Sequence, residues 1–161
     1  MGNTIKVAMA DIKVGVAPDT LISYGLGSCV GIAIYDNVAK IGGLAHIMLP
    51  DSRQSRAGEN PAKFADTAIP IMIKDVLKLG AVHKRLVAKI AGGSQMFHFS
   101  GTNDIMRIGE RNAEAVRLAL KKEGIKLFAE DVGGNYGRTV ELILSSGVYK
   151  IKTIEKGNKE L

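Results

Sequence analysis

The stretch CVGIAIYDNVAKIGGLAHIML, residues 29–49, contains two apolar runs of strand length on either side of a short polar turn. Residues 29–35 are small or β-branched, which is typical of a buried strand, and residues 41–49 resume the pattern. Asp36 and Asn37 favour a turn between the two runs. We therefore predict a β-hairpin, around which the rest of the chain is organised.

The hairpin sets the separation between Cys29 and His46. A loop of two or four residues gives paired positions whose numbers sum to 75, as 29 and 46 do. In that register the two side chains are directly opposed, with Cβ atoms about 5 Å apart. A thiol becomes a nucleophile when a base takes its proton, and histidine is the usual partner. The pairing therefore predicts a cysteine nucleophile with a histidine base.

A glycine-spaced turn, GLGSC, precedes the thiol at residues 25–29. Glycine lets backbone N–H groups turn inward, where they can stabilise an oxyanion. We expect Gly27 and Ser28 to line such a hole, and Asp51 to border the substrate. A third group should orient the imidazole. The residues alone do not choose among four candidates close in sequence: Thr20, Ser23, Asp51 and Ser52.

Length and composition indicate a single globular domain, residues 1–154, followed by a charged tail, residues 155–161, that we expect to be disordered. The single cysteine excludes an internal disulfide and favours a reducing cytoplasm. No apolar run approaches the length of a membrane span, and residues 1–10 lack the pattern of a signal peptide. We therefore expect a cytoplasmic protein without membrane insertion.

The net charge of +6 comes from 22 Lys and Arg against 16 Asp and Glu. By charge alone an acidic protein partner fits as well as nucleic acid, but the basic residues are scattered and not interleaved with aromatics, which disfavours nucleic acid. One cysteine and three histidines without ligand spacing disfavour a metal. The glycines near Cys29 match no nucleotide-binding motif. We expect no cofactor.

Further strands are predicted at residues 5–9, 21–23, 85–91, 125–129, 139–144 and 148–154. One helix should begin at the Asn60-Pro61 cap and end at Gly80, with a kink or break near Ile69 caused by Pro70. A second helix should span residues 108–123 and end at Gly124. Contiguous hairpins favour mixed sheets, so the predicted fold class is α/β or α+β: a layered sandwich of mixed β-sheets flanked by two main helices.

Two glycine-rich segments each have two interpretations. Residues 133–138, GGNYGR, form either a turn between strands or a wall of the site, with Arg138 facing an anion or a substrate amide. Residues 92–97, GGSQMF, have the same two interpretations, a turn between strands or a wall of the site. An exposed Met96-Phe97 pair there would suit a protein partner.

Six motifs together resemble the CheD family of chemoreceptor glutamine deamidases: GLGSCV (25–30), AHIMLPDS (45–52), KFADTA (63–68), IAGG (90–93), IGERN (108–112) and EDVGGN (130–135). The resemblance covers roughly residues 3–154. It implies hydrolysis of particular glutamine side chains on the cytoplasmic helical bundle of chemoreceptors, giving glutamate and ammonia. It also implies a fold similar to that of cytotoxic necrotizing factor toxins, and binding to CheC-type phosphatases.

By position, Cys29 matches the family's nucleophile and His46 its general base, and Ser23 falls where a threonine commonly completes the triad. The implied reaction passes through a cysteine thioester and needs no cofactor. Two alternatives stay open: a non-catalytic regulatory partner of a chemotaxis phosphatase, and a cysteine hydrolase acting on small amides or receptor methyl esters. The intact Cys29 and His46 argue against the first.

Overall fold

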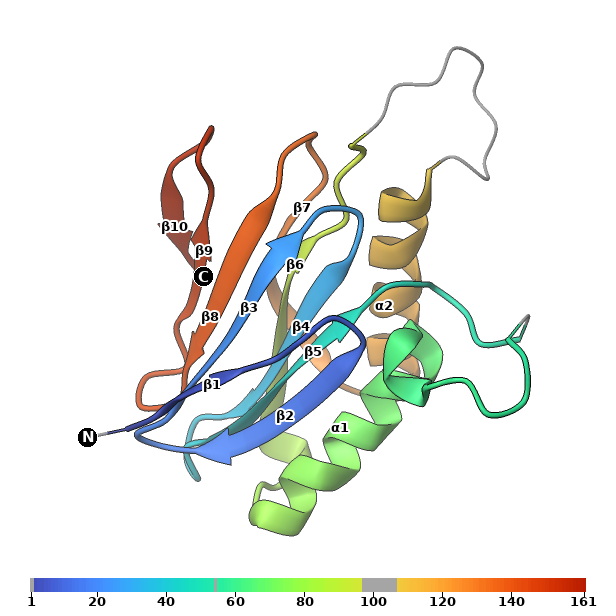
Figure 1. Ribbon diagram of the computed structural model, residues 1–161. Helices are drawn as coiled ribbons and strands as arrows, with labels where there is room; N and C mark the ends of the chain where they lie inside the picture. Colours follow the sequence, from blue (N-terminus) through green and yellow to red (C-terminus); the bar gives the residue numbers. More distant parts are fainter. Residues whose placement is uncertain (1, 54, 97–106) are drawn as a thin grey trace.

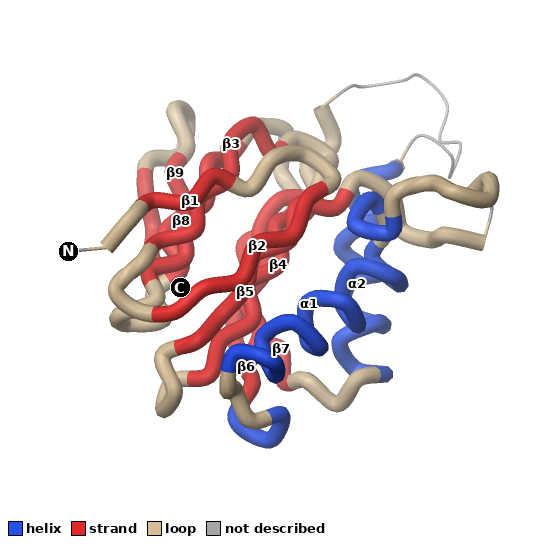
Figure 2. The backbone as a smooth tube through the Cα atoms, turned by 60° about the horizontal axis from the view of Figure 1, so that its bottom comes forward, coloured by secondary structure: helices blue, strands red, loops and turns tan. Residues whose placement is uncertain are grey.

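Two five-stranded sheets face each other in the computed structural model, which describes residues 2–53, 55–96 and 107–161. Two long helices cover the outer face of one sheet, so the molecule has three layers (Figures 1 and 2). The predicted sandwich of mixed sheets flanked by two main helices is confirmed. In the part of the chain that the structure describes, no helix is both long enough and apolar enough to cross a membrane.

Both sheets are mixed. In the first, β1 and β3 run parallel and the other pairs antiparallel; its order is β1 (Thr4–Lys6), β3 (Thr20–Leu26), β8 (Arg138–Ile143), β9 (Tyr149–Lys152) and β10 (Asn158–Glu160). In the second, only β6 and β7 run parallel; its order is β2 (Asp11–Val16), β5 (Ile41–Ile47), β4 (Val30–Asp36), β6 (Leu86–Gly92) and β7 (Lys126–Val132).

The helices α1 (Ala65–Leu79) and α2 (Ile108–Lys122) are both present, and short 3₁₀ turns lie at η1 (Pro61–Lys63) and η2 (His83–Arg85). The predicted start of the first helix at the Asn60-Pro61 cap is wrong, because Asn60 caps η1 and α1 begins after the extended residue Phe64. Gly80 ends α1 in the left-handed conformation, with φ of 116°. The predicted break near Ile69 is wrong, because α1 continues through Pro70. Its buried face, which includes Ile69 and Met72, packs against the second sheet, and this packing outweighs one missing backbone hydrogen bond.

Strand β4 lies at the centre of the second sheet and is buried on both faces. Its side chains alternate, so that Ile32 and Ile34 join the layer under the helices while Ala33 and Tyr35 join the layer between the sheets. The Tyr149 hydroxyl of the first sheet donates a 2.9 Å hydrogen bond to the carbonyl of Gly31. Cys29 belongs to this inter-sheet layer too.

The register of the hairpin differs from the prediction. The β4–β5 pairs sum to 77, so His46 lies opposite Gly31 and Cys29 lies in the loop before β4. The reason is the carboxylate of Asp36, which accepts the N–H groups of Val38 and Ala39 and thereby closes a four-residue loop just after β4. A shift of two residues keeps side chains on the same face. Cys29 and His46 therefore become diagonal neighbours on the inter-sheet side, instead of direct partners.

Two parts of the strand pattern were missed. The first predicted strand is shorter, and a separate strand, β2, follows it; the alternating apolar residues of DIKVGV were the available signal. The expected disorder of residues 155–161 is wrong, because β10 pairs with β9. Lys159 binds Asp131 at 3.1 Å, and Leu161 exchanges backbone hydrogen bonds with Tyr149, so the charged tail has partners that its sequence alone does not show.

Candidate active site

The candidate catalytic residues come from three neighbouring segments of the two sheets. Ser23 is on β3 of the first sheet, and His46 is on β5 of the second. Cys29 ends the loop that leads from β3 to β4 and so from one sheet to the other (Figure 1). All three are buried, with His46 only 1% exposed. The site therefore lies in the layer between the sheets.

The hydrogen bonds of Ser23 fix the tautomer of His46. Its Oγ lies 2.6 Å from the carbonyl oxygen of Val7 and 2.8 Å from His46 Nδ1. A carbonyl can only accept, so the single hydroxyl proton goes to Val7, and Ser23 Oγ accepts from the imidazole. Nδ1 then carries the ring proton and Nε2 carries the lone pair. Nε2 is buried and has no hydrogen-bond partner among the described residues, so it is free to act as a base.

Burial keeps both reacting groups neutral at rest. It lowers the pKa of His46 below its ordinary value of 6.5. It also raises the pKa of the Cys29 thiol above 9.0, which a hydrogen bond from the Cys29 backbone N–H partly opposes. At neutral pH the site therefore holds a thiol and a neutral imidazole. Any attack by this thiol would therefore require a base to take its proton.

Hydrogen bonds to its backbone carbonyl groups hold the turn before the thiol in place. Three consecutive carbonyl groups, those of residues 27–29, each accept one hydrogen bond from outside the turn. The donors are the N–H of Ser94 to Gly27 at 2.9 Å, Nδ2 of Asn112 to Ser28 at 3.0 Å and the N–H of Gly93 to Cys29 at 2.9 Å. The backbone around Cys29 is thus fixed by its surroundings before any substrate arrives.

The N–H groups of the same turn point the other way. In a trans peptide the C=O and the following N–H are antiparallel, so the N–H groups of Ser28 and Cys29 face away from these donors. No described residue accepts a hydrogen bond from the Ser28 N–H, and the Cys29 N–H meets only its own sulfur. Such free donors beside a nucleophile are what an oxyanion hole requires.

The segment GGSQMF supports this turn closely. A Cβ at Gly92 would lie 2.2 Å from the carbonyl oxygen of Cys29, and the φ of Gly92 is 120°. Only glycine fits there without displacing the thiol. Met96 is 44% exposed and packs against Gly27, while Phe97 lies outside the described residues. Residues 92–94 therefore belong to the support of the site.

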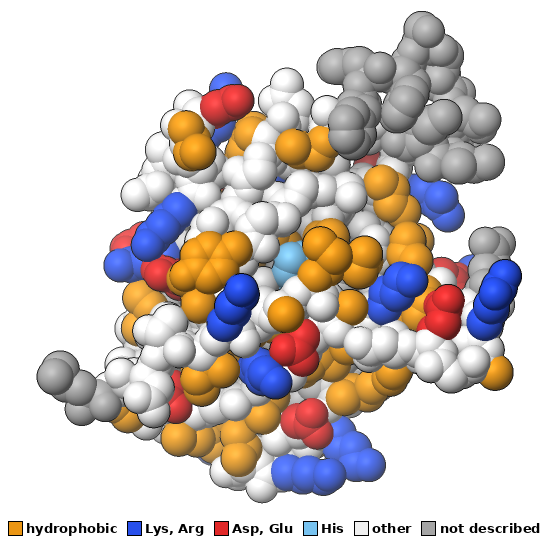
Figure 3. All heavy atoms as spheres, in the orientation of Figure 1, with side chains coloured by type: hydrophobic (Ala, Val, Ile, Leu, Met, Phe, Trp, Pro, Cys, Tyr) orange, Lys and Arg blue, Asp and Glu red, His pale blue; other side chains and the backbone are white. Residues whose placement is uncertain are grey.

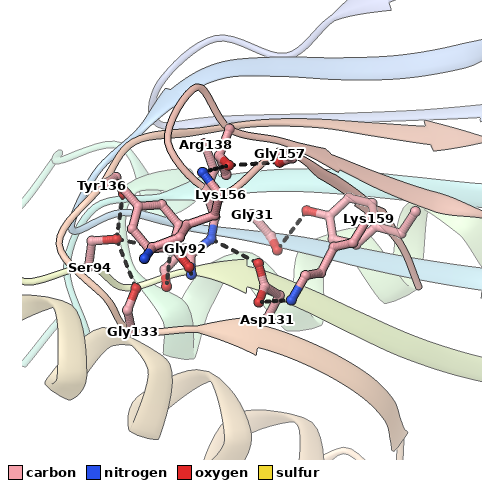
Figure 4. Close-up of polar contacts among 12 residues, drawn as sticks. Gly31, Gly92, Ser94, Asp131, Gly133, Tyr136, Arg138, Lys156, Gly157 and Lys159 are labelled. Atoms are coloured by element: carbon pink, nitrogen blue, oxygen red, sulfur yellow. Dashed lines mark hydrogen bonds and ion pairs between the residues drawn. The ribbon is translucent and has the colours of Figure 1, made fainter.

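Arg138 does not face an anion or a substrate, and that prediction is corrected. Its buried guanidinium binds Asp131 at 3.1 Å, the Gly92 carbonyl at 3.2 Å, Ser94 Oγ at 2.9 Å and the Tyr136 hydroxyl at 3.2 Å (Figure 4). It also lies 4.6 Å from the centre of the Tyr136 ring. Because every nitrogen has a partner, Arg138 stabilises the turn behind Cys29.

Among the candidates for the third group, the structure brings Ser23 to His46. The others make no described bond to the imidazole: Thr20, Asp51 and Ser52. Asp51 binds Arg53 and lines an open pocket of about 590 Å³ beyond β5, together with Phe64 and Arg111. Its place beside the substrate stays a prediction.

Sequence reasoning missed Asn112. This side chain on α2 has no exposed surface, and its Nδ2 donates to the carbonyls of Ser28 and Met48, at 3.0 and 2.9 Å. The available signal was a polar residue at helical spacing among the inward-facing residues of α2, such as Ala113 and Val116.

Ser23→Ala is expected to lower the rate of substrate turnover by about tenfold. Without the serine, His46 Nδ1–H has no buried acceptor, which costs about 1–3 kcal/mol. The imidazole avoids this cost by moving its proton to Nε2, and Nε2 can then no longer act as the base. Ser23→Thr restores the hydroxyl and should recover most of the rate. Nitrogen NMR of the imidazole measures the tautomer directly. A wild-type rate and tautomer in Ser23→Ala would exclude the orienting role.

The fold and the geometry define a class: a mixed α/β sandwich with a cysteine–histidine site between its sheets. The family described as CheD chemotactic sensory transduction matches residues 48–153. This chain belongs to the CheD family.

The relatives align over nearly the whole chain. A "Probable chemoreceptor glutamine deamidase CheD" of Syntrophomonas wolfei is 53% identical over 159 residues, which is 99% of both chains. Proteins with the same description from Desulfitobacterium hafniense (50% identical, 99% of both chains) and Clostridium botulinum (54% identical, 98% of this chain and 97% of the relative) are similar to it too. A solved Neisseria meningitidis protein of family DUF152 has a TM-score of 0.49 at 11% identity, covering 82% of this chain and 62% of the other.

Proposed function

We propose that this chain deamidates specific glutamines of chemoreceptors to glutamate, with release of ammonia, through a thioester on Cys29. The descriptions of the relatives support the receptor substrate. The single observation that carries the mechanism is the hydrogen bond between Ser23 Oγ and His46 Nδ1, because it leaves Nε2 unprotonated in the same layer as the thiol.

The residues support a balanced two-step reaction. Cys29 Sγ attacks the glutamine amide carbon while its proton passes to His46 Nε2. The N–H groups of Ser28 and Cys29 stabilise the oxyanion, each by about 3 kcal/mol. His46 then gives the proton to the leaving nitrogen, so that ammonia departs and a thioester remains. Water attacks the thioester carbon while its proton passes to His46. The C–S bond then breaks, His46 returns the proton to the Cys29 sulfur, and the glutamate is released.

Apolar side chains around the site favour a protein substrate over a free amide. Met9, Tyr24 and Met96 are 54%, 54% and 44% exposed. Each of the three is next to a residue of the site. Tyr24 follows Ser23 in the chain, and Met96 packs on Gly27. Met9 precedes Ala10, whose N–H donates a hydrogen bond to the His46 carbonyl. Figure 3 shows hydrophobic side chains in the middle of this face, with charged side chains around them. Exposed apolar groups beside a site are typical of protein recognition.

The same apolar surface also supports the second part of the proposal, which is binding to a CheC-type phosphatase. A partner that covers Met9, Tyr24 and Met96 would occupy the approach to Cys29. Phosphatase and receptor would then compete for one face of the molecule.

Incubation with the cytoplasmic fragment of a cognate receptor is expected to add about 1 Da to each modified glutamine, as an amide becomes a carboxylic acid. Peptide mass spectrometry locates the change. Free glutamine and a receptor methyl ester, offered at the same concentrations, are expected to stay unchanged. Hydrolysis of either without a change at receptor glutamines would overturn the proposal in favour of a different cysteine hydrolase, and no reaction with any of the three would favour a non-catalytic role.

A further inference from the structure

Within the described part of the chain, three hydrogen bonds hold the thiol turn, and one of them comes from a side chain. Ser94 and Gly93 donate through their backbones, whereas Ser28 is held by the amide of Asn112. The second Nδ2 proton of Asn112 goes to the carbonyl of Met48, two residues after His46. A single side chain thus connects the backbone before the nucleophile to the residue that directly follows the strand carrying the base.

The bond to Ser28 acts on the orientation of one peptide group. The carbonyl of Ser28 and the N–H of Cys29 belong to the same planar unit and point in opposite directions. While Asn112 holds the carbonyl, the Cys29 N–H points toward the side of the thiol. If the peptide rotated, the N–H would leave that side, and one donor to the oxyanion would be lost.

Helix α2 approaches the turn too closely for an adjustable contact. Gly109 lies one helical turn before Asn112, and a Cβ there would lie 2.2 Å from the carbonyl oxygen of Ser94. The helix backbone therefore rests directly on the segment that also holds Gly27. This contact gives Asn112 a fixed base from which to reach Ser28.

The side chain of Asn112 is costly for stability. Its Oδ1 is buried and has no hydrogen-bond partner among residues 2–53, 55–96 and 107–161. An unpartnered buried acceptor lowers the stability of the fold. An apolar residue of similar size would avoid that cost but would release the carbonyl of Ser28. The retained amide therefore indicates a role in the geometry of the site.

We propose that Asn112 is a positioning residue, which orients the Ser28–Cys29 peptide so that the Cys29 N–H is held ready for the oxyanion. It acts through the backbone and touches no substrate. The inference rests on the proposed function for its natural substrate, but the geometry applies to any acyl transfer at Cys29.

The test is Asn112→Asp, which keeps the shape of the side chain and places an oxygen against two carbonyls. The kcat for receptor deamidation is expected to fall by about a hundredfold, the usual loss for one oxyanion donor, with KM little changed. Alkylation of Cys29 by iodoacetamide should slow far less than deamidation, because attack at a saturated carbon forms no oxyanion. Its pH profile should shift only toward higher pH, because the hydrogen bond from the Cys29 N–H that lowers the pKa of the thiol is lost. Asn37→Asp, in the exposed β4–β5 loop, adds the same charge and should behave as the wild type.

Two results would overturn the inference: an unchanged kcat, or an equal loss of kcat and of the alkylation rate, which would indicate general damage to the site. If Asn112→Asp does not fold, Asn112→Ala, which introduces no charge, carries the same comparison. If the wild type does not act on receptors, the proposed function fails by itself. The substrate is then p-nitrophenyl acetate, because attack of Cys29 on its acetyl carbon also gives a tetrahedral oxyanion. Asn112→Asp should lower the rate of this hydrolysis.

Discussion

Cys29→Ser is expected to lower kcat/KM for receptor deamidation by at least about a thousandfold, because a hydroxyl is far less nucleophilic than a thiol and a neutral imidazole activates it poorly. Cys29→Ala should be equally inactive. The measurement is the rate at which receptor glutamines gain mass. Since the chain has one cysteine, loss of the iodoacetamide adduct verifies each variant directly.

The buried thiol makes a structural control necessary. Cys29 packs in the inter-sheet layer, so both variants should be compared with the wild type by urea unfolding. Cys29→Ser is the better match in size, and Cys29→Ala avoids burying a hydroxyl. If either folded variant deamidated receptors at the wild-type rate, Cys29 would not be the nucleophile. If chemotactic signalling persisted unchanged without Cys29, a purely regulatory role would be favoured.

His46→Asn is expected to lower kcat by about 10²–10⁴-fold, because it removes the base. The asparagine amide can occupy the position of Nδ1 and keep the hydrogen bond to Ser23, while nothing replaces Nε2. The fall in kcat is then caused by the loss of proton transfer, and not by the loss of the hydrogen bond that joins the two sheets. Ser23→Ala, which removes that bond and leaves the base, is the matched control, and its loss should be smaller.

The lowered pKa of His46 fixes the sign of two pH effects. The imidazole protonates only at a pH lower than 6.5, so the acid limb of wild-type kcat/KM should lie below 6.5. The unfolded chain binds a proton at 6.5 more readily than the folded chain does. The free energy of unfolding should therefore decrease as pH falls through 6.5, and this component should be absent from His46→Asn. An acid limb above 6.5 would contradict the assignment.

Local sequence was sufficient for the elements that carry the site. The apolar runs of the hairpin, the glycine turn and the buried faces of both helices follow from periodicity and from glycine, and they placed Cys29 beside a turn and His46 on the next strand. The start of α1 does not, because the Asn60 cap belongs to η1. The register was wrong by two residues, because the end of β4 depends on Asp36, whose carboxylate also binds Val82 and Arg85 from a distant part of the chain.

Contacts between distant segments explain the remaining differences. Ser23 was one of several hydroxyl and carboxyl candidates, since its position opposite His46 depends on how two sheets pack. Arg138 carries a charge that suggests a ligand, but Asp131, the 92–94 turn and Tyr136 provide a partner for each of its three guanidinium nitrogens. Asn112 is more than 80 residues from Ser28, so no local pattern shows that they meet.

The bond between Ser23 and His46 makes catalysis depend on the spacing of the sandwich. The two residues belong to different sheets, so the imidazole is oriented only while the sheets keep their separation. A small cavity at Leu44 or Val140, in the apolar layer between the sheets, would let the sheets shift by a fraction of the length of a hydrogen bond. Such a protein would keep its helices and strands on warming and yet lose turnover. Heat inactivation in this fold should therefore precede melting.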